Sequence, residues 1–125
     1  MAGLTPDTPI PTEITLHQGS RILEITFNDG LTFHLPYELL RVYSPSAEVR
    51  GHGPGQETLQ TGKRLVNITN IEPVGHYAIQ PSFSDGHNTG IYSWDYLYHL
   101  GKQQEKLWSD YLQQIETAGA SRDAT

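Results

Sequence analysis

One phrase occurs twice along this chain: an apolar strand, an Asp-Gly turn, a second strand and a short aromatic helix ending in leucine. The first copy covers residues 25–40 with Asp29-Gly30, and the second covers residues 79–100 with Asp85-Gly86. Asp-Gly between alternating apolar runs favours a β-hairpin, because both central residues can take positive φ. The repeat therefore predicts two hairpin units, each followed by a helix.

The rest of the periodicity completes the expected fold. Strands are expected at residues 14–16, 22–27, 31–35, 64–71 and 76–79, with short helices at 36–43 and 94–100. From about Lys102 to Thr117 apolar residues recur at three-and-four spacing, which predicts an amphipathic helix. We expect an α+β fold, with antiparallel β-hairpins, short helices and a C-terminal amphipathic helix.

Length and local composition predict one domain with two tails. The 125 residues are enough to bury a modest core without disulfides. Residues 1–12 are rich in proline and threonine, and residues 118–125 are small or polar, so both should be flexible tails around a single domain at 13–117. The Gly/Pro-rich stretch 44–62 is expected to be a functional or disordered loop.

Charge and cysteine usage exclude several classes of function. Fourteen acidic against eight basic side chains give a net charge of -6, which repels phosphate backbones and anionic leaflets, so no nucleic-acid or membrane partner is expected. The lack of cysteine excludes disulfides, thiolate nucleophiles and cysteine-held zinc or iron-sulfur clusters within this chain. No basic segment followed by an apolar run opens the sequence, which leads us to expect a cytoplasmic protein.

Three runs carry a family resemblance. Residues 39–52 read Leu-Leu-Arg-Val-Tyr-Ser-Pro-Ser-Ala-Glu-Val-Arg-Gly-His, and later come Asp-Gly-His-Asn at 85–88 and Ile-Tyr-Ser-Trp-Asp-Tyr-Leu at 91–97. In this order the motifs resemble the gamma-butyrobetaine hydroxylase-like N-terminal domain family, over about residues 14–101. The resemblance implies a bacterial stand-alone domain of unknown function. Its relatives are attached to P-loop iron-sulfur carrier proteins and to carnitine-pathway hydroxylases.

The resemblance also implies a zinc site. In the hydroxylases this domain holds a structural zinc through three cysteines and one histidine. The alignment puts Ser44, Ser46 and Val49 at the cysteine positions and His87 at the histidine position. A serine hydroxyl is a poor zinc ligand and valine is none. We therefore predict that the zinc site is lost in this chain.

Catalytic motifs are missing from the sequence. None of the six histidines is followed two places later by Asp or Glu, as a non-haem iron site usually requires. The loop 51–64 departs from a phosphate-binding loop at Glu57 and Arg64, and no Gly-x-Ser-x-Gly elbow occurs. We expect no enzymatic activity. An uncharacterised enzyme stays open as an alternative, and its sign would be a pocket enclosing Arg41, His52 and His87.

Basic residues are concentrated in the window 41–64, which holds half of them and only two acids. Its arginines could bind a partner carboxylate; they could equally pair with Glu48 and hold the loop. Aromatic residues around the second helix are typical of recognition surfaces. The interaction candidates are Arg41, Ser44, Ser46, Glu48, Arg50, His52, Tyr96 and Tyr98.

These patterns predict a non-enzymatic binding or accessory module that presents the loop 44–55, beside the His87 turn, to a protein partner, without a cofactor. The alternative is a metal-binding accessory protein for iron or zinc, connected with iron-sulfur cluster assembly. Its candidate ligands are His52, His87, Asp95 and His99. The last two lie four residues apart, a spacing that we interpret first as an exposed helix pair.

Overall fold

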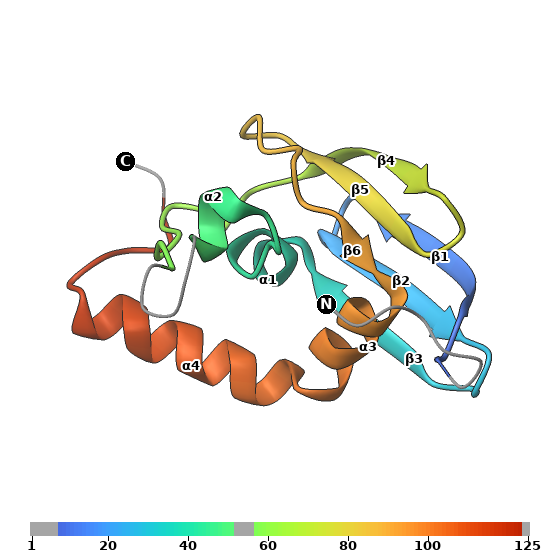
Figure 1. Ribbon diagram of the computed structural model, residues 1–125. Coiled ribbons are helices and arrows are strands. Elements are labelled where there is room, and N and C mark those ends of the chain that lie inside the picture. The colour runs from blue at the N-terminus through green and yellow to red at the C-terminus, as the bar shows by residue number, and fades with distance from the viewer. Residues whose placement is uncertain (1–7, 52–56, 124–125) are drawn as a thin grey trace.

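Each half of the molecule consists of three antiparallel strands followed by helix. The computed structural model describes residues 8–51 and 57–123 (Figure 1). The first half contains β1 (Pro11–His17), β2 (Ile22–Phe27), β3 (Thr32–Pro36), α1 (Tyr37–Val42) and α2 (Ala47–Arg50). The second contains β4 (Ile68–Val74), β5 (Ala78–Phe83), β6 (Tyr92–Ser93), α3 (Trp94–Lys102) and α4 (Gln104–Thr117). Within the described ranges the sheets have the orders β1-β2-β3 and β4-β5-β6, which confirms the α+β fold with its C-terminal helix.

The two Asp-Gly turns have the same hydrogen bonds. In the first, the Phe27 N–H donates to the Leu31 carbonyl at 2.9 Å and the Gly30 N–H donates to the Phe27 carbonyl at 3.0 Å. The second turn repeats both bonds at 2.9 and 3.0 Å within residues 83–87. The repeat in the sequence is therefore a repeat in the structure.

The predicted conformation of these turns is wrong in one respect. Gly30 and Gly86 have positive φ, 90° and 92°, but Asp29 and Asp85 do not. Each aspartate instead uses its Oδ1 to accept the N–H of the residue after the glycine, at 3.0 and 3.2 Å. The turns are thus three-residue loops with glycine in the left-handed position, rather than two-residue loops with both residues there.

Both sheets contribute to a shared core, which surrounds α1. Every residue of α1 is buried, including Glu38 and Arg41. The two charged side chains are paired with Arg122 and Asp85, as buried charges require. The fully buried apolar residues of the core cluster include Leu23, Ile25, Leu35, Tyr37, Leu39, Ile68, Tyr92 and Leu97.

Tyrosine hydroxyls bind backbone carbonyls at the C-terminal end of α1. Tyr92 donates to the Leu40 carbonyl and Tyr96 to the Tyr43 carbonyl. The Tyr43 hydroxyl donates in turn to the Leu107 carbonyl of α4 at 2.6 Å. Because the last carbonyls of a helix lack partners within it, these tyrosines satisfy that end of α1 and attach it to α3 and α4.

The first strand starts before the predicted domain boundary. β1 begins at Pro11, inside the segment expected to be a tail, and pairs with β2. The Asn28 N–H donates to the Ile10 carbonyl at 2.8 Å, and the Asn28 side chain accepts the Ile10 N–H at 3.2 Å. Residues 1–7 lie outside the described residues. Contacts with the first Asp-Gly turn thus extend the strand to the edge of the Pro-rich segment.

The C-terminal segment also differs from the expected flexible tail. The Gly62 N–H donates to the Ser121 carbonyl and the Arg64 N–H to the Arg122 carbonyl, both at 3.0 Å. Arg122 makes two hydrogen bonds to the Glu38 carboxylate, at 2.7 and 2.9 Å. Residues 121–122 are therefore docked, because they find backbone and charged partners far away in the sequence.

Candidate functional site

A buried imidazole joins the turn after β5 to the loop after α1. His87 is 6% exposed, and its Nε2 lies 2.8 Å from Ser44 Oγ and 3.4 Å from Ser46 Oγ. Its Nδ1 lies 3.4 Å from a carboxylate oxygen of Glu48. We call these four residues the histidine cluster. Since Ser46 directly precedes α2 and Glu48 lies in it, the cluster attaches α2 to the second Asp-Gly turn.

Burial favours the neutral form of this imidazole. Burial and the nearby Arg41 guanidinium lower the pKa of His87, against the opposing effect of the Glu48 carboxylate. A neutral imidazole has one N–H donor and one acceptor nitrogen. We assign the proton to Nδ1, facing Glu48, so that Nε2 accepts a serine hydroxyl. Every polar atom of the ring then has a partner.

Asp85 binds two cations beside the cluster. Arg41 Nε and Lys63 Nζ lie 2.9 and 2.6 Å from the same carboxylate oxygen of Asp85. Burial raises the pKa of Asp85, but the hydrogen bond from Lys63, with those from the backbone and Arg41, lowers it to about 2. The carboxylate is therefore ionised throughout the physiological range. Arg41 is committed to this internal pair, not to Glu48.

The other cations of the window 41–64 divide into paired and available ones. Arg64 pairs with Asp123, so that Arg41, Lys63 and Arg64 all have carboxylate partners. Arg50 is exposed, and no carboxylate within residues 8–51 and 57–123 lies at ion-pair distance from it. Within the described residues, Arg50 is thus the arginine of this window without a carboxylate partner.

A pocket of about 520 Å³ lies beside this arginine. The Arg50 guanidinium carbon is 6.0 Å from the centroid of the Tyr96 ring, and both residues line the pocket. His99 and Gln114 add polar groups, and the apolar walls come from α1, α3 and α4. We call this cavity the Arg50 pocket, and its apolar lining consists of Val42, Val49, Leu59, Leu100, Leu107 and Tyr111.

The remaining interaction candidates are dispersed. Tyr96 and Tyr98 are half-buried, and both hydroxyls are bound within the chain, that of Tyr98 to Asp29 at 2.7 Å. His52 lies outside the described residues. The Arg50 pocket is not lined by Arg41 or His87, so it lacks the lining expected of the enzyme alternative.

The residues at the zinc-ligand positions do not form a zinc site. The structure brings Ser44 and Ser46 to His87 and buries Val49 on α2. Two hydroxyls, an alkyl group and one imidazole do not fit a tetrahedral zinc ion. A hydrogen-bond network takes the place that metal coordination would have in the resembling enzymes.

Asp95 and His99, the other proposed ligands that the structure describes, are not part of a metal-binding group within residues 8–51 and 57–123. The Asp95 carboxylate accepts a hydrogen bond from the Ser93 hydroxyl, and His99 lies exposed on α3. Among the residues that the structure describes, no group of three or more His, Asp or Glu side chains is arranged to hold a metal ion.

Sequence reasoning missed the role of Asp85 and Lys63. The sequence identifies Asp85 as a turn and motif residue, yet its second oxygen binds both cations. Asp29 in the first turn likewise uses one oxygen for the turn and the other for Tyr98, a contact that the repeat in the sequence does not signal. Which partner reaches the second oxygen depends on tertiary structure.

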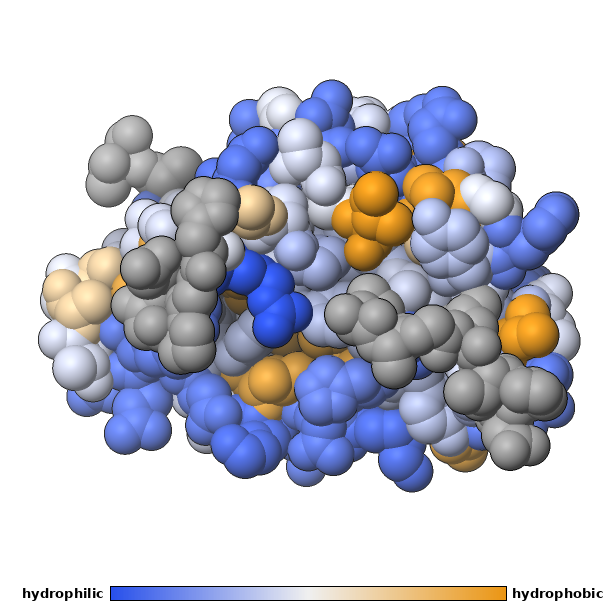
Figure 2. Space-filling view, viewed as in Figure 1, coloured by the Kyte–Doolittle hydropathy of each residue, from blue (hydrophilic) through white to orange (hydrophobic). Residues whose placement is uncertain are grey.

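The surface in the view of Figure 2 is mostly hydrophilic, with small separate apolar areas. Exposed large apolar residues come from distant parts of the chain: Ile10, Leu31, Leu65, Tyr77, Ile91 and Leu112. None of the helices in the described part of the chain has the length and apolar character needed to cross a bilayer.

Comparisons with known proteins agree with this architecture. Two solution structures determined by NMR match with TM-scores of 0.81 and 0.80, at 46% and 53% identity; they cover 93% and 96% of this chain and 91% of each matched chain. A crystal structure of a protein of unknown function from Acidithiobacillus ferrooxidans, assigned to the DUF971 family, matches at 44% identity with a TM-score of 0.62, over 73% of this chain and 91% of its own.

The search among curated proteins gave no match. The family model described as gamma-butyrobetaine hydroxylase-like, N-terminal, matches residues 14–98. The matched region includes both Asp-Gly turns and the whole histidine cluster. The chain belongs to the gamma-butyrobetaine hydroxylase-like N-terminal family.

Proposed function

We propose that this protein is a non-enzymatic accessory module that binds a carboxylate-bearing segment of a protein partner at the Arg50 pocket. The observation that carries the proposal is the guanidinium of Arg50, which has no carboxylate partner among the described residues and lies beside Tyr96 and a cavity with apolar walls. Arginine presents a planar fork of donors that matches a carboxylate. An acidic side chain or a chain terminus of the partner is the matching group.

The shape of the Arg50 pocket supports this reading. Its volume of about 520 Å³ is within the range of protein ligand sites, which combine apolar walls with a few polar groups. An apolar side chain next to the partner's carboxylate would fill the walls from α3 and α4. Residues that contribute most to binding at interfaces are enriched in arginine and tyrosine and cluster in pockets.

The histidine cluster has a positioning role in this proposal. Arg50 is the last residue of α2, a helix of four residues that has little stability of its own. Bonds from Ser46 and Glu48 to the buried His87 hold α2 against the second Asp-Gly turn. The cluster thereby sets the place of the arginine.

Burial of the serine supports the non-enzymatic part of the proposal. Ser44 contacts His87, which contacts Glu48, as in a serine–histidine–acid catalytic triad. However, Ser44 is fully buried, and a Cβ added at Gly90 would lie 2.5 Å from its Oγ. A nucleophile packed this closely against backbone has no space for a substrate carbonyl.

Affinity capture with matched arginine variants tests the proposal. We expect Arg50→Ala to lose specific partners of the wild type, quantified by mass spectrometry, and Arg50→Lys to retain part of the binding. Arg64→Ala is the matched control, because this exposed arginine of the same window already pairs with Asp123. Identical partner lists for wild type and Arg50→Ala would sink the proposal.

Elemental analysis of protein purified without a histidine tag tests the metal-binding alternative. The proposal predicts substoichiometric zinc and iron, because His87 is already bound by serine hydroxyls. Stoichiometric metal that disappears in His87→Ala would overturn the accessory-module reading and favour the metal-handling one.

A further inference from the structure

Three ionisable side chains meet on the outer face of the sheet β1-β2-β3. In β2 every second residue is buried in the core, so Ile22 and Glu24 lie on the opposite face. His17 of β1 is paired with Ile22, and His34 of β3 is paired with Glu24. Because directly paired residues lie on the same face of a sheet, His17, Glu24 and His34 share the outer face. We call these three residues the outer-face cluster.

The two imidazoles of the outer-face cluster approach one carboxylate oxygen. His17 Nε2 lies 2.8 Å from Glu24 Oε1, and His34 Nε2 lies 3.7 Å from the same oxygen. Within residues 8–51 and 57–123, no other basic side chain lies at ion-pair distance from Glu24. Two imidazoles and one carboxylate form a ligand set that suits divalent transition metal ions.

The spacing of these donor atoms is close to that of zinc ligands. Zinc binds imidazole nitrogen and carboxylate oxygen at about 2.0–2.2 Å, so two ligands of a tetrahedral ion are about 3.4 Å apart. The two observed separations, 2.8 and 3.7 Å, lie on either side of this value. Shifts of about half an ångström would give both pairs of atoms the separation of zinc ligands.

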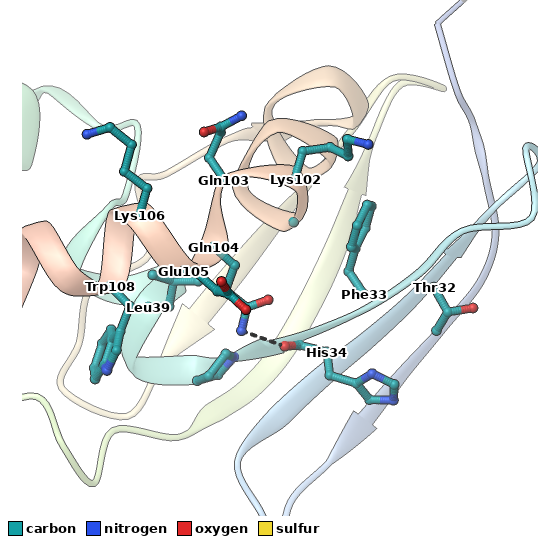
Figure 3. Close-up of a pocket in the computed structure, with 12 residues that line it drawn as sticks. Thr32, Phe33, His34, Leu39, Lys102, Gln103, Gln104, Glu105, Lys106 and Trp108 are labelled. Carbon is teal, nitrogen blue, oxygen red and sulfur yellow. Dashed lines mark hydrogen bonds between the residues drawn. The ribbon is translucent and has the colours of Figure 1, made fainter.

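The side chains of the cluster stand as hydrogen-bonded groups and are not arranged around an ion. Since His17 already contacts Glu24, metal binding depends on a turn of the His34 ring, whose side chain is 60% exposed. The backbone of this residue is held, because the His34 carbonyl accepts the Gln104 side-chain amide at 3.0 Å. Figure 3 shows the imidazole pointing away from this bond. The ring can therefore turn while the strand stays in place.

We propose that the outer-face cluster binds a divalent transition metal ion such as zinc, with Nε2 of His17, Nε2 of His34 and the Glu24 carboxylate as ligands. The exposed His17–Glu24 contact contributes little to stability, so an ion replaces it at low cost. Three protein ligands leave one tetrahedral position for water or for a donor atom of another molecule. The inference goes beyond the proposed function, since it needs neither Arg50 nor its pocket.

Calorimetric titration of zinc chloride into the full-length, untagged and chelator-treated chain tests the site. We expect one ion per chain with a Kd on the order of 10 μM, weaker than a structural site with four ligands. Because an ion bound this weakly dissociates during purification, it has to be added back. The ring signals of His17 and His34 should shift in NMR spectra when zinc is added. Magnesium should not bind, because it prefers oxygen ligands.

Single substitutions separate the three ligands from other histidines. His17→Ala, His34→Ala and Glu24→Gln should each weaken zinc binding about tenfold or more, since the loss of an outer-shell partner alone costs that much. His76→Ala is the matched control, because it removes an exposed histidine outside the cluster and should keep the wild-type affinity. His87→Gln should also keep it. Circular dichroism and thermal unfolding check that each variant is folded.

Unchanged zinc affinity in His34→Ala would overturn the three-ligand site. The absence of both heat and ring shifts at about 0.5 mM zinc, far above the expected Kd, would overturn it as well. Zinc binding that is lost in His87→Gln and kept in the three cluster variants would overturn the site and favour the metal-handling alternative. Arg50→Ala should bind zinc like the wild type, so failure of the proposed function would leave this result standing.

Discussion

At His87, a neutral imidazole forms a hydrogen-bond network with buried serine hydroxyls, in a position where a charged or metal-bound group could lie. The equivalent position in the first Asp-Gly turn is Leu31, which is 38% exposed, whereas His87 is 6% exposed. The same backbone turn thus presents its next residue to solvent in one half and to the interior in the other. The loop after α1 makes the difference, because its serines and α2 cover the second turn.

Titration of this residue predicts a dependence of stability on pH. Burial lowers the pKa of His87 below its ordinary value of about 6.5. As pH falls, His87 binds a proton in the unfolded chain before it does so in the folded chain. Its contribution to the free energy of unfolding is therefore fully present above about pH 6.5 and is lost as pH falls toward the pKa of the folded state. Asp85, with a pKa of about 2, stays ionised in this window.

We expect the free energy of urea unfolding to fall more steeply between about pH 7.5 and about pH 5.5 in wild type than in His87→Gln, which cannot titrate. His76→Gln, at an exposed histidine, is the control and should keep the wild-type slope. Equal slopes for wild type and His87→Gln would contradict the buried neutral imidazole.

Among the elements, α3 and β4 depart most clearly from local rules. α3 continues through Gly101 to Lys102, although glycine lowers helix propensity. β4 includes Pro73, where the sequence pattern ended the strand, and Pro73 pairs with Ile79. Proline is tolerated there because β4 is an edge strand that pairs with β5 alone in its sheet.

Gly101→Ala tests whether packing or propensity decides α3. Propensity alone predicts a gain of about 1 kcal/mol. The new Cβ would lie 2.3 Å from the Phe33 ring, which Phe27 and Tyr98 contact at centroid distances of 5.9 and 5.5 Å. We therefore expect the free energy of urea unfolding to fall by about 1–2 kcal/mol, since the cost of overpacking exceeds the gain from helix propensity.

Two further variants test the explanation of the Gly101→Ala result. Phe33→Leu in the Gly101→Ala background should recover part of the loss, because the smaller side chain leaves space for the Cβ. Gly19→Ala, with no atom within 4 Å of the new Cβ, should change stability by less than about 0.5 kcal/mol. A stabilised Gly101→Ala protein would show that α3 does not approach β3 this closely.

On the scale of the whole molecule, the helical side is closed by the C-terminal segment. α1, α2 and α4 lie on one side of the molecule and the two sheets on the other (Figure 1). Arg122 binds the buried Glu38 of α1, and its guanidinium carbon lies 4.9 Å from the centroid of the Trp108 ring of α4. One side chain thereby connects α1 to α4.

Removal of this contact should destabilise the fold. Arg122→Ala leaves the Glu38 carboxylate buried and unpaired, which typically costs about 3 kcal/mol or more, read from urea unfolding. The double variant Glu38→Gln with Arg122→Met should lose less, because no charge stays buried. Lys106→Ala, at an exposed pair with Asp110, should change stability by less than about 0.5 kcal/mol. If Arg122→Ala lowers the free energy of unfolding no more than Lys106→Ala does, the C-terminal segment is not docked in solution.

The sequence alone determined the repeated turns, the α+β class, the amphipathic C-terminal helix and the family, because turn chemistry and periodicity depend on neighbours a few residues away. It also determined that the zinc positions lack sulfur, since ligand chemistry is a property of residue types. Only the tertiary structure decided that Arg41 binds Asp85, that Arg50 has no carboxylate partner among the described residues, that residues 121–122 dock and that Gln104 reaches the edge of β3. Each of those contacts joins residues more than 40 positions apart or depends on burial by distant segments, and no local pattern encodes such distances.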